Sequence, residues 1–399
     1  MNPEIKAVHA DTRVVAAALA LLAVGGVALA QAYGARHAAL FLTGGGLGVA
    51  LYHALFGFTS AWRAFLTEGR GAGLRAQMVM LALATIIFLP VIAGGTLFGR
   101  PVGGAIAPAG VSVLVGAFLF GIGMQFGGGC ASGTLFTVGG GSVRMVVTLA
   151  AFIAGSLIST LHAPFWYALP SLGSVSITAS FGTGPALVLQ LCAFAAIWWA
   201  SALFERRRFG SLAAGIEFPT GAEIARRALR GPWPLVWGAV ALALLNVLTL
   251  ALAGHPWSIT FAFGLWGAKI AALGGIDVAA WEFWTWPAPA RALGRSVFAD
   301  VTSVMNFGII GGALLAAGLA GKFRPSLSIP PRALVAEILG GLLLGYGARL
   351  AFGCNIGAFF SGVASGSLHG WLWFAAALAG NYAGLRLRPL FAPASAGKG

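Results

Sequence analysis

Residues 116–137 read GAFLFGIGMQFGGGCASGTLFT and residues 340–361 read GGLLLGYGARLAFGCNIGAFFS, so the chain carries one pattern twice, at an offset of 224 residues (116 to 340). Eight of these 22 positions are identical, among them the pairs Gly129–Cys130 and Gly353–Cys354. In membrane proteins, glycine-interrupted apolar segments at matching places in two halves indicate a substrate site near the middle of the bilayer. The duplication therefore predicts two structural repeats that share one central site.

The composition is that of a membrane protein. Charged residues make up 9% of the 399 residues and apolar residues 59%, whereas soluble domains carry about 25% charged residues. We expect an all-α polytopic membrane protein with about nine transmembrane helices, the first of which is retained because no cleavage site follows it. The expected spans are residues 14–31, 38–56, 76–98, 145–161, 185–204, 235–253, 257–276, 301–321 and 368–385.

The repeat suggests a division of the chain into three parts. Residues 1–161 form the first repeat half and residues 235–399 the second. Between them, residues 162–234 form a linker that contains one transmembrane helix and a basic loop.

The net charge of +14 does not indicate nucleic-acid binding. The lysines and arginines lie at the ends of apolar spans, where they orient a chain in the bilayer. The loop 162–184 carries no charged residue, whereas Arg206, Arg207 and Arg208 follow the span 185–204. The positive-inside rule therefore places the arginines in the cytoplasm and the neutral loop outside.

The sequence leaves two topologies open. If residues 111–143 and 333–367 cross the membrane fully, eleven spans result. If each segment dips in and returns to its own side, nine spans remain and the second half is inverted relative to the first. We expect this second arrangement, with the linker and C-terminus in the cytoplasm and the N-terminus outside. It conflicts with the positive-inside rule because it leaves six basic residues outside: Arg63, Arg70, Arg75, Lys322, Arg324 and Arg332.

The glycines beside the two cysteines predict breaks in the helices. A glycine costs about 1 kcal/mol relative to alanine inside a helix, and a helix N-terminus that follows a break is a ready-made anion site. Two such ends would form a central constriction lined by thiols. The alternative is that the glycines only permit close helix packing. The predicted site comprises Cys130, Cys354, Gly129, Ala131, Ser132, Gly133, Gly353, Asn355, Ile356, Gly357 and Arg349.

Arg349 is the ionisable residue nearest to Cys354 in sequence, and an ionisable group within a span is by default a functional hypothesis. It either attracts anions or forms an ion pair with Glu337 or Asp300. Cys192 has no motif around it and is expected to be an ordinary apolar residue.

No metal, cofactor or ATP site is expected. The sequence contains no CxxC motif, no cysteine and histidine cluster near the central cysteines, and no P-loop pattern.

These residues resemble the YeeE/YedE family of membrane proteins, whose better-characterised members take up thiosulfate. The resemblance rests on FGGGCASGTLFTVGGGS around Cys130, on GYGARLAFGCNIGAFFSGVASGSLHGWLW around Cys354 and on DVTSVMNFG at residues 300–308. It implies an hourglass-shaped inverted-repeat permease of the bacterial inner membrane, in which Cys130 and Cys354 relay a small sulfur-containing anion. A cytoplasmic sulfur-carrier or sulfurtransferase protein is a candidate partner.

The chain departs from this family pattern at one position. Thiosulfate transporters of the family carry a third cysteine in an early FCFT-like sequence, where this chain has Gly57 between Phe56 and Phe58. Three functions therefore stay open: a thiosulfate permease, a permease for another sulfur or selenium compound, and a membrane-embedded thiol enzyme or sulfur carrier in which the two cysteines change covalent state.

Overall fold

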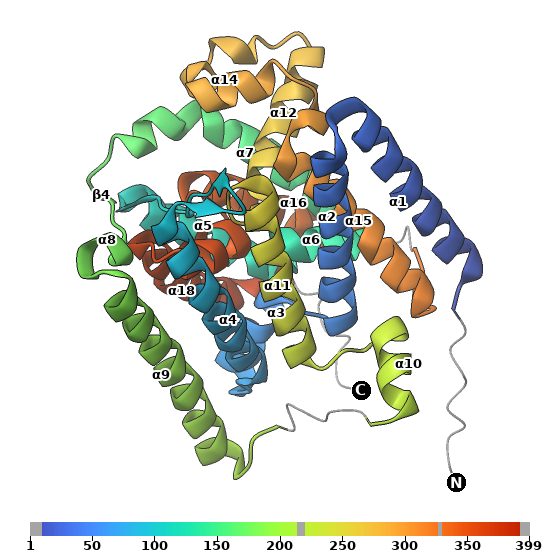
Figure 1. Ribbon diagram of the computed structural model, residues 1–399, viewed down its shortest axis with the longest axis vertical. Coiled ribbons are helices and arrows are strands. Elements are labelled where there is room, and N and C mark those ends of the chain that lie inside the picture. Colours follow the sequence, from blue (N-terminus) through green and yellow to red (C-terminus); the bar gives the residue numbers. More distant parts are fainter. Residues whose placement is uncertain (1–9, 214–219, 326–328, 392–399) are drawn as a thin grey trace.

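The computed structural model describes residues 10–213, 220–325 and 329–391, and helices dominate this part of the chain (Figure 1). The first half contains α1 (Thr12–Tyr33), α2 (Ala35–Ala54), α3 (Phe58–Arg63), η1 (Ala64–Glu68), α4 (Ala72–Gly94), α5 (Val111–Phe126), α6 (Ala131–Gly139) and α7 (Val143–Tyr167). The linker contains α8 (Ile177–Phe181), α9 (Thr183–Phe209) and α10 (Ala222–Arg230).

The second half contains α11 (Leu235–Ala253), α12 (Thr260–Leu273), η2 (Val278–Ala280), α13 (Glu282–Thr285), α14 (Pro287–Leu293), η3 (Val297–Ala299), α15 (Val301–Leu319), α16 (Pro331–Leu350), η4 (Asn355–Ser361), α17 (Gly362–Ala364), α18 (Leu368–Leu387) and η5 (Arg388–Phe391). Four short strands form two antiparallel pairs: β1 (Thr96–Leu97) with β2 (Arg100–Pro101), and β3 (Pro108–Gly110) with β4 (Ser171–Ser174).

The prediction of an all-α polytopic membrane protein is confirmed. Within the described residues, nine helical segments are long and apolar enough to cross a membrane. Two of the predicted spans are not among them. α12 has 14 residues, or about 20 Å of helix, which is shorter than the ~30 Å hydrocarbon core. α18 is a helix as expected but is not one of the nine, and the segments Val111–Gly139 and Pro331–Leu350 complete the set instead.

Many basic residues lie on one face of the molecule, which we call the arginine face. Figure 1 shows α10 at this end of the molecule, with α14 at the opposite end. The backbone N–H of Asp11, just before α1, donates to the carbonyl of Gly318 near the end of α15. α15 in turn contacts α10 of the linker. The start of α1 therefore lies on the same face as the linker.

Ion pairs attach the loop after η1 and the start of α4 to the same face. Arg70 and Arg75 both bind the buried carboxylate of Glu205 near the end of α9, at 3.3 and 2.8 Å. The backbone N–H of Gly71 donates to Glu205 as well, at 3.0 Å. Because Glu205 directly precedes the Arg206–Arg208 run, Arg70 and Arg75 lie beside the arginines at the end of α9.

This arrangement corrects the predicted topology. The expectation that the N-terminal end of the first helix faces away from the linker is wrong, because Asp11 lies on the arginine face; residues 1–9 themselves lie outside the described part. The arginines at positions 70 and 75, which the predicted arrangement left outside, also lie on this face. The conflict with the positive-inside rule is therefore removed for them.

The two Gly-Cys segments run the length of the neighbouring helices and do not return to their starting side. The N–H of Val111 donates to the carbonyl of Pro170, which follows the C-terminal end of α7. Residue 143 begins α7 at its other end, and 25 helical residues separate the two ends by about 36 Å. Residues 111–143 therefore connect opposite faces. The segment 331–367 does the same in the opposite direction alongside α18, since Ala333 and Leu385 line one cavity near the C-terminal end of α18.

The contacts between the two Gly-Cys segments and their neighbours occur twice. α5 packs against α18, and α16 packs against α7. A side chain at Gly121 would collide with the carbonyl of Ala377, and one at Gly345, 224 residues later, would collide with the carbonyl of Phe152. These reciprocal approaches support the internal repeat, while the boundaries of its halves stay a prediction.

Candidate functional site

Cys130 caps the first broken helix. α5 ends at Phe126, three glycines follow, and Cys130 is the residue before α6. Its sulfur accepts a hydrogen bond from the N–H of Gly133 at 3.4 Å and lies 3.3 Å from the hydroxyl oxygen of Ser132. A side-chain acceptor at this position satisfies one of the free N–H groups of a helix start. Cys130 thus performs the role for which serine or aspartate is more usual.

Cys354 caps the second broken helix in the same way. α16 ends at Leu350, and the continuous helical segment Asn355–Ala364 begins after Cys354. The sulfur of Cys354 accepts from the N–H of Ile356 at 3.4 Å. Its carbonyl oxygen accepts from the N–H of Ala358 at 2.9 Å. The predicted break and helix start are therefore present at both cysteines.

The glycines at the breaks have conformations and surroundings that exclude larger residues. Gly128 has φ +70° and Gly353 has φ +152°, both in the region that L-residues rarely adopt. A Cβ atom on Gly353 would also lie 2.6 Å from the backbone nitrogen of Ala358. The indole N–H of Trp373 donates to the Gly353 carbonyl at 3.2 Å and fixes the break.

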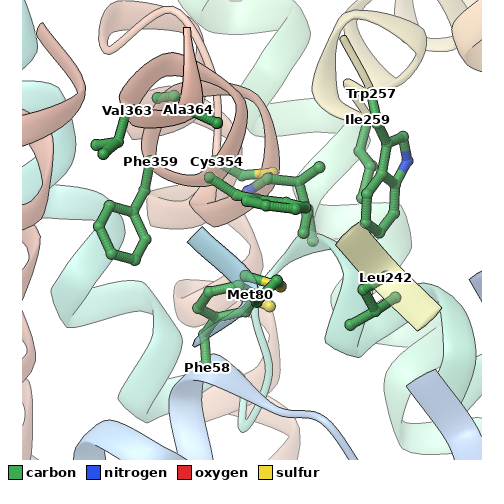
Figure 2. Packing of buried hydrophobic residues seen from close by; sticks show 14 of the residues in the cluster. Phe58, Met80, Leu242, Trp257, Ile259, Cys354, Phe359, Val363 and Ala364 are labelled. Atoms are coloured by element: carbon green, nitrogen blue, oxygen red, sulfur yellow. The ribbon is translucent and has the colours of Figure 1, made fainter. Parts of the chain in front are cut away.

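The fold brings the two cysteines into one buried cluster. α6 contacts η4, and the thiols of Cys130 and Cys354 are 1% and 0% exposed. Both are free cysteines. Figure 2 shows Cys354 above Phe58 and Met80, with Phe359 on one side and Trp257 on the other. The walls around the thiols are thus aromatic and aliphatic side chains from both halves.

Most other predicted site residues are also buried at the breaks: Gly129, Ala131, Ser132 and Gly133 around α6, and Gly353, Asn355, Ile356 and Gly357 around η4. Asn355 is notable because it is 0% exposed and neither polar atom of its amide has a hydrogen-bond partner in the described part of the chain. A buried amide without partners costs roughly 1–3 kcal/mol. This polar group therefore marks a place that a ligand or water would satisfy.

Arg349 is not brought to the cysteines. Its guanidinium lies over the rings of Phe283 and Phe261, at 5.2 and 5.8 Å from their centres. Neither of the predicted carboxylate partners binds it: Glu337 pairs with Arg144, and Asp300 caps α15. Its Nε atom is buried without a partner in the described residues. The ion-pair alternative is therefore wrong, and the role in anion attraction stays a prediction.

Position 57 lies at the start of another short helix in this region. Gly57 caps α3 with φ −105° and ψ 121°, which any residue can adopt. Its neighbours Phe56 and Phe58 belong to the same buried cluster as both cysteines. The departure from the family pattern therefore leaves a residue without a side chain close to the thiol region.

The sequence did not reveal that the loop before α12 also supports the site. The side chain of Asn246 in α11 accepts from the N–H of Trp257 at 2.8 Å and donates to the hydroxyl of Ser361 in η4 at 3.3 Å. Ser361 donates to the Trp257 carbonyl at 2.7 Å. The chain therefore dips beside η4 after α11. Only the shortness of the stretch 256–273, which lies between His255 and the glycines at 274–275, could have indicated this dip.

Known proteins share this sequence pattern. Residues 53–383 match the family model described as sulphur transport. The chain is 29% identical over 337 residues to the thiosulfate transporter TsuA of Spirochaeta thermophila, covering 82% of this chain and 91% of that protein. It is 22% identical over 268 residues to the thiosulfate transporter TsuA of Escherichia coli, covering 66% of this chain and 70% of the relative.

A second group of relatives matches over a shorter region. The probable transporter YedE of Escherichia coli is 30% identical over 161 residues, which is 40% of this chain and 39% of the relative. The aligned region thus spans about two fifths of the length of the YedE proteins. The family model, in contrast, includes both Gly-Cys segments and the helices between them. The chain, with its multiple membrane-spanning helices, therefore belongs to the sulphur transport family.

Proposed function

We propose that the protein is an inner-membrane permease that takes up a small sulfur-containing anion, most specifically thiosulfate, through a constriction formed by Cys130 and Cys354. The observation that carries this proposal is the contact between two broken helices, each of which begins at a buried free thiol. A helix N-terminus presents N–H groups and a partial positive charge, so it attracts an anion without binding it tightly.

The thiols suit a soft sulfur anion because they are weak hydrogen-bond donors. Each sulfur accepts a backbone N–H, from Gly133 and Ile356, and these bonds do not use the thiol hydrogen, which can donate to a passing anion. Several guanidinium groups at the desolvated constriction itself would hold a dianion too strongly to release it, whereas weak successive contacts permit conduction. The unpartnered amide of Asn355 offers one more donor beside Cys354.

Uptake of isotopically labelled thiosulfate by cells that lack other thiosulfate permeases tests the proposal. We expect Cys130→Ala and Cys354→Ala each to lose most uptake at unchanged expression, and serine to restore little because a hydroxyl is a harder and more strongly hydrated group. Cys192→Ala is the matched control, since Cys192 is exposed on α9. Full uptake by the double variant Cys130→Ala, Cys354→Ala would refute the thiol relay.

Competition and reduction separate this proposal from its alternatives. Unlabelled sulfur and selenium anions should each inhibit the uptake of labelled thiosulfate, and the anions that the protein transports best should inhibit it most. This ranking identifies the substrate. Transport should continue when a reductant keeps both thiols free, because no covalent step is involved. Uptake that a reductant abolishes would instead favour a thiol enzyme or sulfur carrier.

A further inference from the structure

The arginine face contains a cavity that leads toward the first break. Its volume is about 540 Å³, and its lining includes Gln125, Gly128, Arg144 and Arg388. We call it the arginine vestibule. Gly128 lies two residues before Cys130, so the vestibule reaches the chain segment from which the buried thiol projects.

Arginines outnumber carboxylates around the vestibule. Arg144 binds the buried carboxylate of Glu337. Arg388 forms no ion pair within the described ranges and lies in electrostatic range of Arg63. Arg144 and Arg388 therefore line the vestibule, and no Asp or Glu side chain is among its lining residues in the described part of the chain. A concave surface with an excess of one charge concentrates counter-ions of the opposite sign.

A buried amide relay holds one of these arginines in place. The Nε of Arg63 donates to the side-chain oxygen of Gln125 at 2.9 Å, and the Gln125 nitrogen donates to the side-chain oxygen of Asn381 at 2.5 Å. Gln125 is the repeat counterpart of Arg349, 224 residues later. Each half thus has a guanidinium group associated with this repeat position. In the second half it belongs to Arg349 itself, and in the first half it belongs to Arg63, which is bound to Gln125.

We infer that the arginine vestibule is a binding site for small, doubly charged oxyanions, in which the anion is held weakly between the constriction and the solvent of the arginine face. This inference rests on the proposed function for the direction of flow, but binding in the vestibule does not depend on transport. The volume exceeds that of one small anion, so the anion keeps part of its hydration shell. Arg388 supplies attraction from the rim, where its charge is not already neutralised.

The test compares Arg388→Gln with Arg386→Gln, two residues away. Arg386 carries the same charge but does not line the cavity; it contacts Tyr382 through a 2.6 Å hydrogen bond. A single cysteine at Ala333, which lines the vestibule, is placed in a Cys192→Ala background. Its modification rates by anionic and by cationic methanethiosulfonate reagents report the local potential. We expect Arg388→Gln to lower the anionic-to-cationic rate ratio about fivefold, as removal of one charge at roughly 7 Å predicts. Arg386→Gln should change it much less.

Binding is measured separately in detergent. Sodium thiosulfate should raise the unfolding midpoint of the protein above that in sodium chloride of equal ionic strength, and Arg388→Gln should reduce this rise while Arg386→Gln should not. Equal behaviour of the two variants in both measurements overturns the inference. Stabilisation by phosphatidylglycerol but not by thiosulfate also overturns it, since the site would then hold a lipid headgroup. If the vestibule passes both tests but the parent protein takes up no thiosulfate, the proposed function fails and the anion site stands.

Discussion

At the scale of single residues, the chain uses cysteine where helix starts ordinarily use oxygen side chains. Cys130 and Cys354 each cap a helix through sulfur and remain free thiols. A serine in either position would satisfy the same backbone N–H. The structural role is therefore replaceable, and a requirement for sulfur itself would have to come from the transported anion.

The absent third thiol can be restored. A Cβ at Gly57 would approach the hydroxyl oxygen of Ser60 at 2.6 Å, and no other atom lies closer than 3.7 Å. The Ser60 side chain can rotate away, so we expect Gly57→Cys to fold with an unchanged unfolding midpoint. If three thiols relay thiosulfate better than two, its uptake rate should exceed that of the parent. Gly57→Ala, which adds volume without a thiol, is the control, and an equal rate in both variants would show that two thiols suffice.

We expect Arg349 to attract the anion without affecting the maximal rate of uptake. Its guanidinium is held over Phe261 and Phe283 without a carboxylate partner in the described part of the chain. We expect Arg349→Gln to raise the half-saturation constant for thiosulfate about threefold, as loss of one screened charge predicts, with the maximal rate unchanged. Arg349→Lys keeps the charge and should remain near the parent. Unchanged kinetics in the glutamine variant would assign Arg349 to packing.

At the scale of elements, the site depends on helices that pack with almost no space between their backbones. α16 packs against α7, and α5 packs against α18, through glycines that meet carbonyl oxygens. Small residues let helices approach closely in this manner. Glycines in these segments therefore have two roles that the sequence could not separate. Some break the helices beside the thiols, and others let the broken helices pack closely against their neighbours.

Gly345 tests the packing role without touching the thiols. A Cβ on Gly345 would collide with the carbonyl of Phe152 and lie 2.5 Å from the N–H nitrogen of Ser156. Overpacking of this kind costs about 1–3 kcal/mol, so Gly345→Ala should lower the thermal unfolding midpoint in detergent. Gly94→Ala is the matched control because nothing lies within 4 Å of its added Cβ. A midpoint as high as that of the control would mean that α7 and α16 move apart easily.

At the scale of the whole molecule, basic residues gather on one face. Glu205 near the end of α9 binds Arg75 at the start of α4 there, and Asp11 before α1 donates to Gly318 of α15, which contacts α10. The opposite face carries the β3–β4 pair and the loop at residue 367, which are joined by the N–H of Leu368 and the carbonyl of Val175. The positive-inside rule then assigns the arginine face to the cytoplasm.

Labelling of single introduced cysteines checks this orientation. We expect Ala10→Cys and Ser211→Cys to react with an impermeant thiol reagent only from the cytoplasmic side. Leu172→Cys, at an exposed position of β4, should react only from outside. Labelling of positions 10 and 211 from opposite sides would contradict the fold. A Cys192→Ala background removes the one exposed native cysteine.

The sequence alone determined the class, the repeat and the breaks. A 59% apolar composition cannot be buried in a soluble core, and residues 116–137 and 340–361 share glycines and a cysteine that local chemistry turns into a broken helix with a capped start. These properties depend on neighbouring residues in the chain, so they can be read from it.

Only the tertiary structure decided how the segments cross and which side chains meet. Whether residues 111–143 return or continue depends on the packing of α5 beside α7 and α18, and no local pattern encodes that choice. Arg349 lies five residues from Cys354 in sequence, yet its guanidinium contacts Phe261 and Phe283 instead. Which residue pairs with a charged side chain depends on distances between helices that are far apart in sequence. Hydropathy shows how apolar a helix is, but it does not show which helices lie next to it.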